Sequence, residues 1–223
     1  MTGPGGRSSK NSLGRHPKDG APVTDTSGVE ANRLPGRPRS AEADRAILRA
    51  AVDLLADEGY GGVTMEGVAA RAGVGKATVY RRWPCKSALV VDAITACRES
   101  GGQPPDTGSA REDLLVFVRA FMHHLRTSDA GRVMPALVAE LSRSPELAEA
   151  FREGFVQPRR AKVLEAVRRG VERGEVRAGV DPELVADGVV ALLMHRFLVT
   201  GMEIDDDLPE RVVDMLWRGI AER

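Results

Sequence analysis

The sequence has no excess of either charge and no long apolar run. Its 223 residues include 32 Lys or Arg and 32 Asp or Glu, so only local clusters of charge can predict a charged partner. No stretch approaches the roughly 18 consecutive apolar residues that identify a membrane-spanning helix. The first residues are polar and rich in glycine, whereas a secretory signal would carry an apolar segment. We therefore predict a cytoplasmic protein that makes no use of a membrane.

Cysteines and enzyme motifs are equally scarce. Cys85 and Cys97 are too few for a disulfide framework, and we expect both to be free thiols. The sequence has no glycine-rich phosphate loop, no metal-ligand set and no nucleophile and base at plausible spacing. His123, His124 and His195 do not form such a set, because adjacent histidines on a helix point about 100° apart. We predict no enzymatic activity, no metal site and no cofactor.

Apolar residues recur at helical spacing along most of the chain, and no segment alternates with the period of a strand. This pattern predicts an all-α protein. Residues 1–36 contain almost no aliphatic side chains and are expected to form a disordered tail. A Gly- and Pro-rich stretch at residues 100–105 predicts a domain boundary. We expect a smaller N-terminal helical domain over residues 37–100 and a larger C-terminal helical domain over residues 110–223.

Caps and glycines set the expected helix boundaries in the N-terminal domain. The first helix should begin with Ser40 as its N-cap and Glu42 in its first turn, and end before Gly59. Thr64 is the expected N-cap of a second, short helix that ends at Gly73. The third and fourth helices are expected over residues 76–83 and from residue 86 onward.

Apolar stripes predict six helices in the C-terminal domain. Four stripes cover residues 114–125, 134–141, 147–155 and 163–171. Asp181, Pro182 and Glu183 then form a helix start, with Asp as the cap, Pro at the first helical position and Glu near the positive end of the helix dipole. That helix should end at Gly201, and the last helix should begin at Pro209.

One short stretch carries positive charge without any acid. From Arg71 to Lys86 the sequence has five cations and no Asp or Glu. A short helix, a glycine turn and a second short helix predict a helix-turn-helix, whose second helix can lie in the DNA major groove. On that helix Val79 and Trp83 share the apolar side, which would face the core. The stretch therefore predicts binding to double-stranded DNA. The alternative is a surface helix whose cations are simply solvated.

The other side of that helix carries groups that suit DNA. Ala77 is small enough to let the backbone approach the duplex, and Thr78 and Tyr80 have hydroxyls that donate to phosphates. An arginine can donate two hydrogen bonds to guanine. Before the first helix, Arg37 and Arg39 resemble the arginine arms that enter an A·T-rich minor groove. The alternative for these two arginines is a solvated linker end.

The same residues resemble the helix-turn-helix signature of the TetR (tetracycline-repressor-like) family of transcriptional regulators. The resemblance covers about residues 40–100 and rests on TMEGVA at 64–69 and AGVGKATVYRRWPCKSAL at 72–89. It implies a homodimeric repressor that binds a palindromic operator and is released when a small molecule binds the C-terminal domain. Gly75 and Cys85 replace serines that are common in the family, and Trp83 replaces a common phenylalanine.

By position, the resemblance assigns roles to several residues. The residues implied to lie at the DNA are Lys76, Thr78, Tyr80 and Lys86 along the phosphates and Ala77, Arg81 and Arg82 nearest the bases. Thr64 is expected among the DNA-binding residues as well. In the family's plan the last two long helices pair with those of a second copy. The expected interface residues are Leu192, Leu193, Phe197, Val213, Leu216 and Trp217. Packing within one subunit is the alternative for these residues.

A ligand cavity is expected among the adaptable apolar side chains of the C-terminal domain. Its expected lining is Met122, His123, Met134, Phe151, Phe155 and Met194, and ordinary core packing is the alternative. Two other modes of action stay open. Cys85 next to Lys86 has the surroundings of a reactive thiol, so regulation by oxidation is one of them. A ligand-independent architectural DNA binder is the other.

Overall fold

The computed structural model describes residue 1, residues 38–96 and residues 105–222. The described residues form helices and no strand, apart from an isolated bridge between Val176 and Ala221. This confirms the all-α prediction. The elements are α1 Pro38–Gly62, α2 Met65–Arg71, α3 Lys76–Tyr80, α4 Lys86–Ala96, α5 Ala110–Thr127, α6 Asp129–Glu140, α7 Pro145–Phe151, the π-helical turn η1 Arg152–Val156, α8 Gln157–Glu172, α9 Pro182–His195, the π-helical turn η2 Arg196–Thr200 and α10 Leu208–Ile220.

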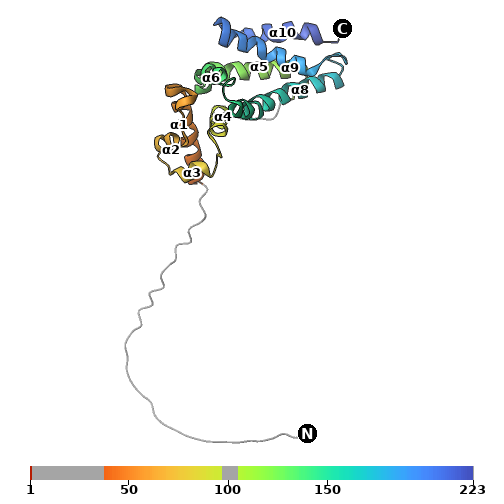
Figure 1. The fold of residues 1–223 in the computed structure, drawn as a ribbon. Helices are drawn as coiled ribbons and strands as arrows, with labels where there is room; N and C mark the ends of the chain where they lie inside the picture. Colours follow the sequence, from red (N-terminus) through yellow and green to blue (C-terminus); the bar gives the residue numbers. More distant parts are fainter. Residues whose placement is uncertain (2–37, 97–104, 223) are drawn as a thin grey trace, which may run out of the picture. The chain divides into compact units, whose positions relative to one another are not determined.

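The first helix begins earlier than the sequence predicts. It starts at Pro38, so Ser40 is inside the helix and Glu42 lies beyond its first turn. A proline is well tolerated at a helix start, because its missing N–H would have no partner there. Gly59 breaks the helical geometry with φ of 69°, as expected from the sequence, and a further turn comes after it. The helix α1 contacts α2, α4 and α6 (Figure 1).

The two short helices also follow local signals. Thr64 caps α2, as predicted, because its Oγ1 accepts a hydrogen bond from the backbone N of Gly67 at 3.0 Å. Gly73 has φ of 66° and forms the turn. The helix α3 ends at Tyr80, three residues before the predicted end, and the chain continues in a hydrogen-bonded turn to the buried Trp83.

The stripes predicted at 147–155 and 163–171 form one long run, α7–η1–α8, instead of two separate helices. Pro158 explains the π-helical turn between them. A proline lacks an N–H, and its ring would clash with the carbonyl four residues earlier, at Gly154. The backbone widens there, and the N of Gln157 donates to the O of Arg152 five residues earlier. The last helix begins at Leu208, one residue before Pro209.

The C-terminal helices pack around α5 and α8. Helix α5 lies against α6, α8 and α10, and α9 lies between α8 and α10 (Figure 1). Buried apolar side chains from both halves of the described chain form one continuous core. None of the helices within the described ranges combines the length and apolar character that crossing a bilayer requires.

A buried carboxylate ties the segment before α5 to α8. The side chain of Asp113 is fully buried. Its Oδ1 accepts hydrogen bonds from the backbone N and the hydroxyl of Thr107, both at 2.8 Å. Its Oδ2 accepts from Nη2 of Arg169 at 3.0 Å, and the same Nη2 donates to the carbonyl of Pro105. This cluster fixes the beginning of the C-terminal bundle.

Candidate DNA-binding surface and ligand cavity

Glu66 at the start of α2 sets the position of α3. Its carboxylate lies 3.6 Å from Nζ of Lys76 and accepts a hydrogen bond from the hydroxyl of Tyr80 at 3.3 Å. The pKa of Glu66 is lowered, first by a hydrogen bond from its own backbone N–H and further by the charge of Lys76. The pKa of Tyr80 is raised, first by desolvation and then by the Glu66 carboxylate. Glu66 therefore stays ionised at neutral pH, and Tyr80 stays a hydrogen-bond donor.

Two cations of the acid-free run hold the helix-turn-helix on α1. Arg71 forms an ion pair with Asp57, with Nη2 and Oδ2 separated by 2.7 Å. Arg82 forms an ion pair with Asp44 and donates from Nη1 to the carbonyl of Thr78 at 3.1 Å. The Arg82 side chain is mostly buried. The Arg82 side chain therefore lies against α1. The expectation had placed it at the bases together with the Arg81 side chain.

Lys86 makes a third tie. Its Nζ donates to the carbonyl of Tyr60 at 3.0 Å and lies 4.1 Å from the centroid of the Tyr60 ring. A cation over an aromatic face is held by the ring quadrupole. Arg81 is different: its side chain is exposed and forms no ion pair or hydrogen bond with a described residue. Among the five cations of this run, Arg81 is therefore the one whose guanidinium is available to contact another molecule.

The exposed side of α3 carries the remaining candidates together. Lys76, Ala77, Tyr80 and Arg81 are exposed, and the Thr78 side chain is half-buried. Val79 and Trp83 are buried on the other side, as the sequence pattern predicts. Arg37 and the side chain of Arg39 lie outside the described residues. We name the exposed set Lys76, Ala77, Tyr80 and Arg81 the α3 face.

A cavity of about 430 Å³ opens among the C-terminal helices. Four of the six residues expected to line it do so, namely Met134, Phe151, Phe155 and Met194. The other two lie elsewhere: Met122 is buried outside the lining and His123 is exposed. Their neighbour Phe121 takes the lining position, because consecutive residues of a helix point in different directions. We name this space the helical cavity.

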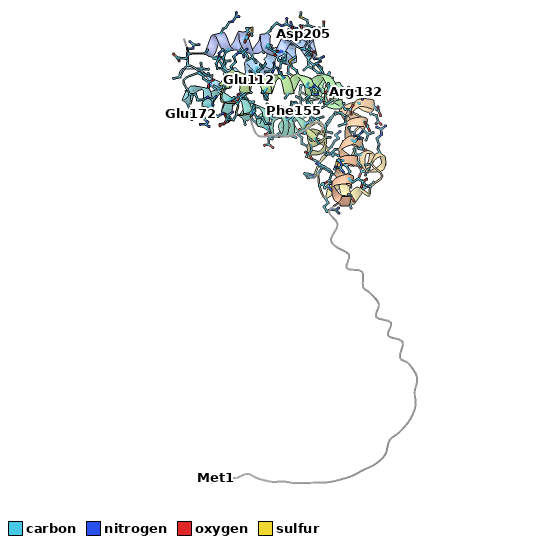
Figure 2. The ribbon with its side chains drawn as sticks, turned by 180° about the vertical axis from the view of Figure 1, so that it is seen from behind. Met1, Glu112, Arg132, Phe155, Glu172 and Asp205 are labelled. Carbon is cyan, nitrogen blue, oxygen red and sulfur yellow. The ribbon has the colours of Figure 1, made fainter. Side chains whose placement is uncertain are left out.

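Sequence reasoning missed Arg159 in the wall of the helical cavity. Only 5% of this residue is exposed. The signal that could have found it is its spacing of four from Phe155, which puts both residues on one side of a helical run. The two rings of Phe151 and Phe155 stack with centroids 4.8 Å apart on the same wall. Figure 2 labels Phe155.

The expected interface residues divide into two groups. Leu193 and Val213 are buried inside the subunit, whereas Leu192 is 37% exposed and Phe197, Leu216 and Trp217 are half-buried. Further large exposed apolar side chains lie on α9, on η2, in the segment after η2 and on α10. These side chains are Leu184, Val199, Met202 and Met215. The exposed apolar surface thus lies on the two helices expected at the interface, although not on every residue expected there.

The remaining candidates are scattered. Cys85 is half-buried, with its Sγ 3.2 Å from Oγ of Ser87, and Cys97 lies outside the described residues. His124 is buried, whereas His195 is exposed. In the part of the chain that the structure describes, no group of three or more His, Cys, Asp or Glu side chains is placed to hold a metal ion.

An exposed helix face on a helix-turn-helix, carried by an all-α body, defines a DNA-binding transcriptional regulator. Residues 47–93 match the family model described as bacterial regulatory proteins, tetR family. Residues 104–216 match the Tetracyclin repressor-like, C-terminal domain. The chain belongs to the TetR family of transcriptional regulators.

Known relatives cover most of the chain. It is similar to the uncharacterized HTH-type transcriptional regulator YdeS of Bacillus subtilis, with 34% identity over 83% of this chain and 93% of YdeS. It is also similar to the DNA-binding transcriptional repressor TetR of Mycobacteroides abscessus, with 36% identity over 80% of this chain and 92% of that repressor. The crystal structure of the TetR family transcription regulator SCO0332 superposes with a TM-score of 0.63 and 33% identity, covering 81% of this chain and 100% of SCO0332.

Proposed function

We propose that this protein is a homodimeric repressor that binds a palindromic operator in the cytoplasm and leaves it when a small molecule enters the helical cavity. Residues 37–100 form its DNA-binding domain and residues 110–223 its regulatory and dimerisation domain, and we assign it no enzymatic activity. The similarity to a DNA-binding transcriptional repressor supports the sign of regulation. The observation that carries the proposal is that one segment, α7–η1, both lines the helical cavity and contacts α4, the helix directly after the helix-turn-helix.

The α3 face is the proposed base-reading surface. Arg81 reads bases, Ala77 permits close approach, and Lys76 and Tyr80 bind phosphates together with Thr78. We propose that Thr64 and Lys86 reach phosphates at the two ends of the helix-turn-helix, and that Arg82 supports α3 from behind. Two copies are needed to read a palindrome. Exposed Leu192, Val199 and Met215 on α9, η2 and α10 support an interface there, since large exposed apolar patches mark contact surfaces.

A selection of bound duplexes from a random DNA pool tests the proposal. With the purified full chain at physiological salt, we expect sequencing to recover an inverted repeat whose half-sites are about one helical turn apart or a small multiple of it. Binding that depends steeply on salt and enriches no sequence would instead identify the architectural DNA binder. A single, non-repeated site would contradict the proposed dimer.

The link between the cavity and the DNA-binding domain depends on close contacts at α4. Oγ of Ser87 on α4 donates to Oε1 of Glu146 on α7 at 2.6 Å. That hydrogen bond is the main reason why the pKa of Glu146 lies below its ordinary value. A Cβ added at Gly154 in η1 would lie 2.7 Å from Cγ1 of Val91 on α4. A ligand that moves η1 by a fraction of an ångström therefore moves α4.

We expect Gly154→Ala to weaken operator binding by about tenfold, a coupling of ordinary allosteric size. The added methyl group pushes α4 away and imitates the effector. Val91→Ala in the same chain removes the opposing methyl groups and should restore operator affinity. The measurement is the equilibrium affinity for the selected operator, with the unfolding midpoint recorded for each variant. Operator affinity that is unchanged in Gly154→Ala, or reduced further in the double variant, would contradict this route.

A further inference from the structure

We infer that the protein has a second small-molecule site, between α4 and η1, and that this site binds an organic cation. The site is a groove of about 480 Å³ that shares no lining residue with the helical cavity. We name it the α4–η1 groove, after the elements that provide its lining residues Asp92 and Glu153. This site goes beyond the proposed function, because it requires neither an operator nor an effector in the helical cavity.

The floor of the α4–η1 groove is apolar. Trp83 is 7% exposed and Val91 is 4% exposed, so both side chains lie at the bottom of the groove and not at its rim. Pro84, Ala88 and Ala150 add to the apolar lining. The volume of the groove falls in the range of small-molecule sites. The body of a matching ligand is therefore apolar or aromatic, because apolar walls give no return for desolvating polar groups.

The two carboxylates of the groove lack a cationic partner among the described residues. The charged lining residues are Arg82, Asp92 and Glu153, and Arg82 forms an ion pair with Asp44 on α1. Asp92 is exposed, and its Oδ2 accepts a hydrogen bond at 2.9 Å from an uncharged group, Nε1 of Trp83. Glu153 is exposed and forms no ion pair or hydrogen bond with a described residue. The groove therefore presents two negative charges to a ligand.

The indole and the carboxylates together favour an ammonium group. Tryptophan attracts cations more strongly than the other aromatic side chains do, and its hydrogen bond holds the Asp92 carboxylate at the edge of the Trp83 ring. The hydroxyl oxygen of Thr95, which also lines the groove, is buried and has no hydrogen-bond partner among the described residues. A primary ammonium group has three N–H donors. It can therefore donate to both carboxylates and to the Thr95 hydroxyl.

Asp92 and Glu153 belong to different elements. Asp92 lies on α4 and Glu153 on η1, and these two elements contact each other. Like charges on the two sides of one groove repel each other, whereas a cation between them is attracted to both. A bound cation therefore joins α4 to η1.

Three probes with one phenyl group test the charge of the ligand. They are 2-phenylethylamine, which is a cation at neutral pH, the uncharged 2-phenylethanol and the anion 3-phenylpropanoate. Each is titrated by calorimetry into the purified full chain. We expect the amine to bind roughly thirtyfold tighter than the alcohol, because it gains two ion pairs and a contact with the indole. 3-Phenylpropanoate should bind most weakly, because it brings a third carboxylate to the groove.

Tryptophan fluorescence locates the bound amine. The sequence has two tryptophans, Trp83 in the groove and Trp217 on α10. In Trp217→Phe, 2-phenylethylamine should change the emission of Trp83 with the affinity that calorimetry gives for the same variant. In Trp83→Phe, the amine should leave the emission of Trp217 unchanged.

Variants of the two carboxylates measure what each contributes. Asp92→Asn keeps an oxygen that accepts from Trp83, and Glu153→Gln keeps the size of the side chain. Each should lower the affinity for the amine about fivefold, and the double variant should remove its preference over the alcohol. Glu149→Gln is the matched control, because Glu149 is paired with Arg152 and does not line the groove. Its effect should stay below about twofold, and the unfolding midpoint is recorded for every variant.

Several outcomes would overturn the α4–η1 groove as a cation site. Equal binding of the amine and the alcohol to the unaltered chain would do so, as would tightest binding of 3-phenylpropanoate. Binding of the amine without a change in the emission of Trp83 would place it elsewhere. An equal loss in Glu149→Gln and Glu153→Gln would show an effect of net charge alone. Binding of none of the three probes would also overturn the site, whereas the DNA selection tests the proposed function independently of all these results.

Discussion

Replacing Arg81 by alanine is expected to cost about 1–3 kcal/mol of operator binding at each half-site, roughly tenfold to a hundredfold in affinity. The loss should be specific: binding to duplexes with the altered base at the contacted position should fall much less. The Arg81 side chain is exposed and forms no ion pair or hydrogen bond with a described residue. Its removal therefore subtracts a DNA contact without leaving a buried group unpaired. Affinity for the selected operator and for base-substituted duplexes at several salt concentrations is the measurement.

The controls for Arg81→Ala are two other cations of the same run. Arg71 is paired with Asp57 on the protein, so Arg71→Ala should change operator affinity by less than about fivefold. Lys86→Ala should weaken binding to all sequences alike and make the dependence on salt less steep, because a phosphate contact carries no sequence information. If Arg81→Ala and Lys86→Ala lowered affinity equally for every sequence, the division between base-reading and phosphate-binding residues would be wrong.

Asp113→Ala is expected to lower the free energy of unfolding by about 3–5 kcal/mol, because it removes the buried carboxylate of Arg169 and leaves this arginine only its more exposed acidic neighbours, Asp106 and Glu165. The Arg169 side chain is 15% exposed and the Asp113 side chain 0%. The change also removes the acceptor of two hydrogen bonds from Thr107. For a chain of this size the thermal midpoint should fall by on the order of 10 °C. Calorimetry or denaturant unfolding of the full chain measures this effect.

Asp106→Ala is the matched control for Asp113→Ala. Asp106 lies near the same arginine, with its Oδ1 3.7 Å from Nε of Arg169, but its side chain is 61% exposed. An exposed ion pair contributes about 0–1 kcal/mol, so this variant should unfold close to the unaltered chain. A similar loss of stability in both variants would show that the cluster acts through net charge and not through the buried hydrogen bonds of Asp113.

The sequence predicted those features that depend on a few neighbouring residues. The Thr64 cap, the break at Gly59 and the turn at Gly73 each depend on one side chain or one positive φ. The buried side of α3 was predictable from helical spacing in the same way. The start at Pro38 was missed because Ser40 is an equally good local signal. Here the helix extends through Ser40 to a proline that suits its first turn.

The candidate site depended more on contacts between helices, which a single sequence does not display. Arg81 and Arg82 are adjacent and identical, yet one is exposed and the other is paired with Asp44 on α1. The position of Arg160 likewise depends on packing, because the residue pairs with Glu183 and Asp187 on α9. The π-helical turn at 152–156 rotates the helix α8 about its axis, so a stripe counted at ideal helical spacing loses its register there.

The ties from Arg71, Arg82 and Lys86 to α1 have a mechanical consequence. They join the helix-turn-helix to α1 at Asp57, Asp44 and Tyr60, so the first four helices form one rigid unit. In the proposed repressor, a displacement of α4 therefore rotates α1 to α4 together as one rigid unit and leaves the α3 face undistorted. The effector then changes the distance between the two α3 faces of the dimer and leaves the base contacts that each face can make unchanged.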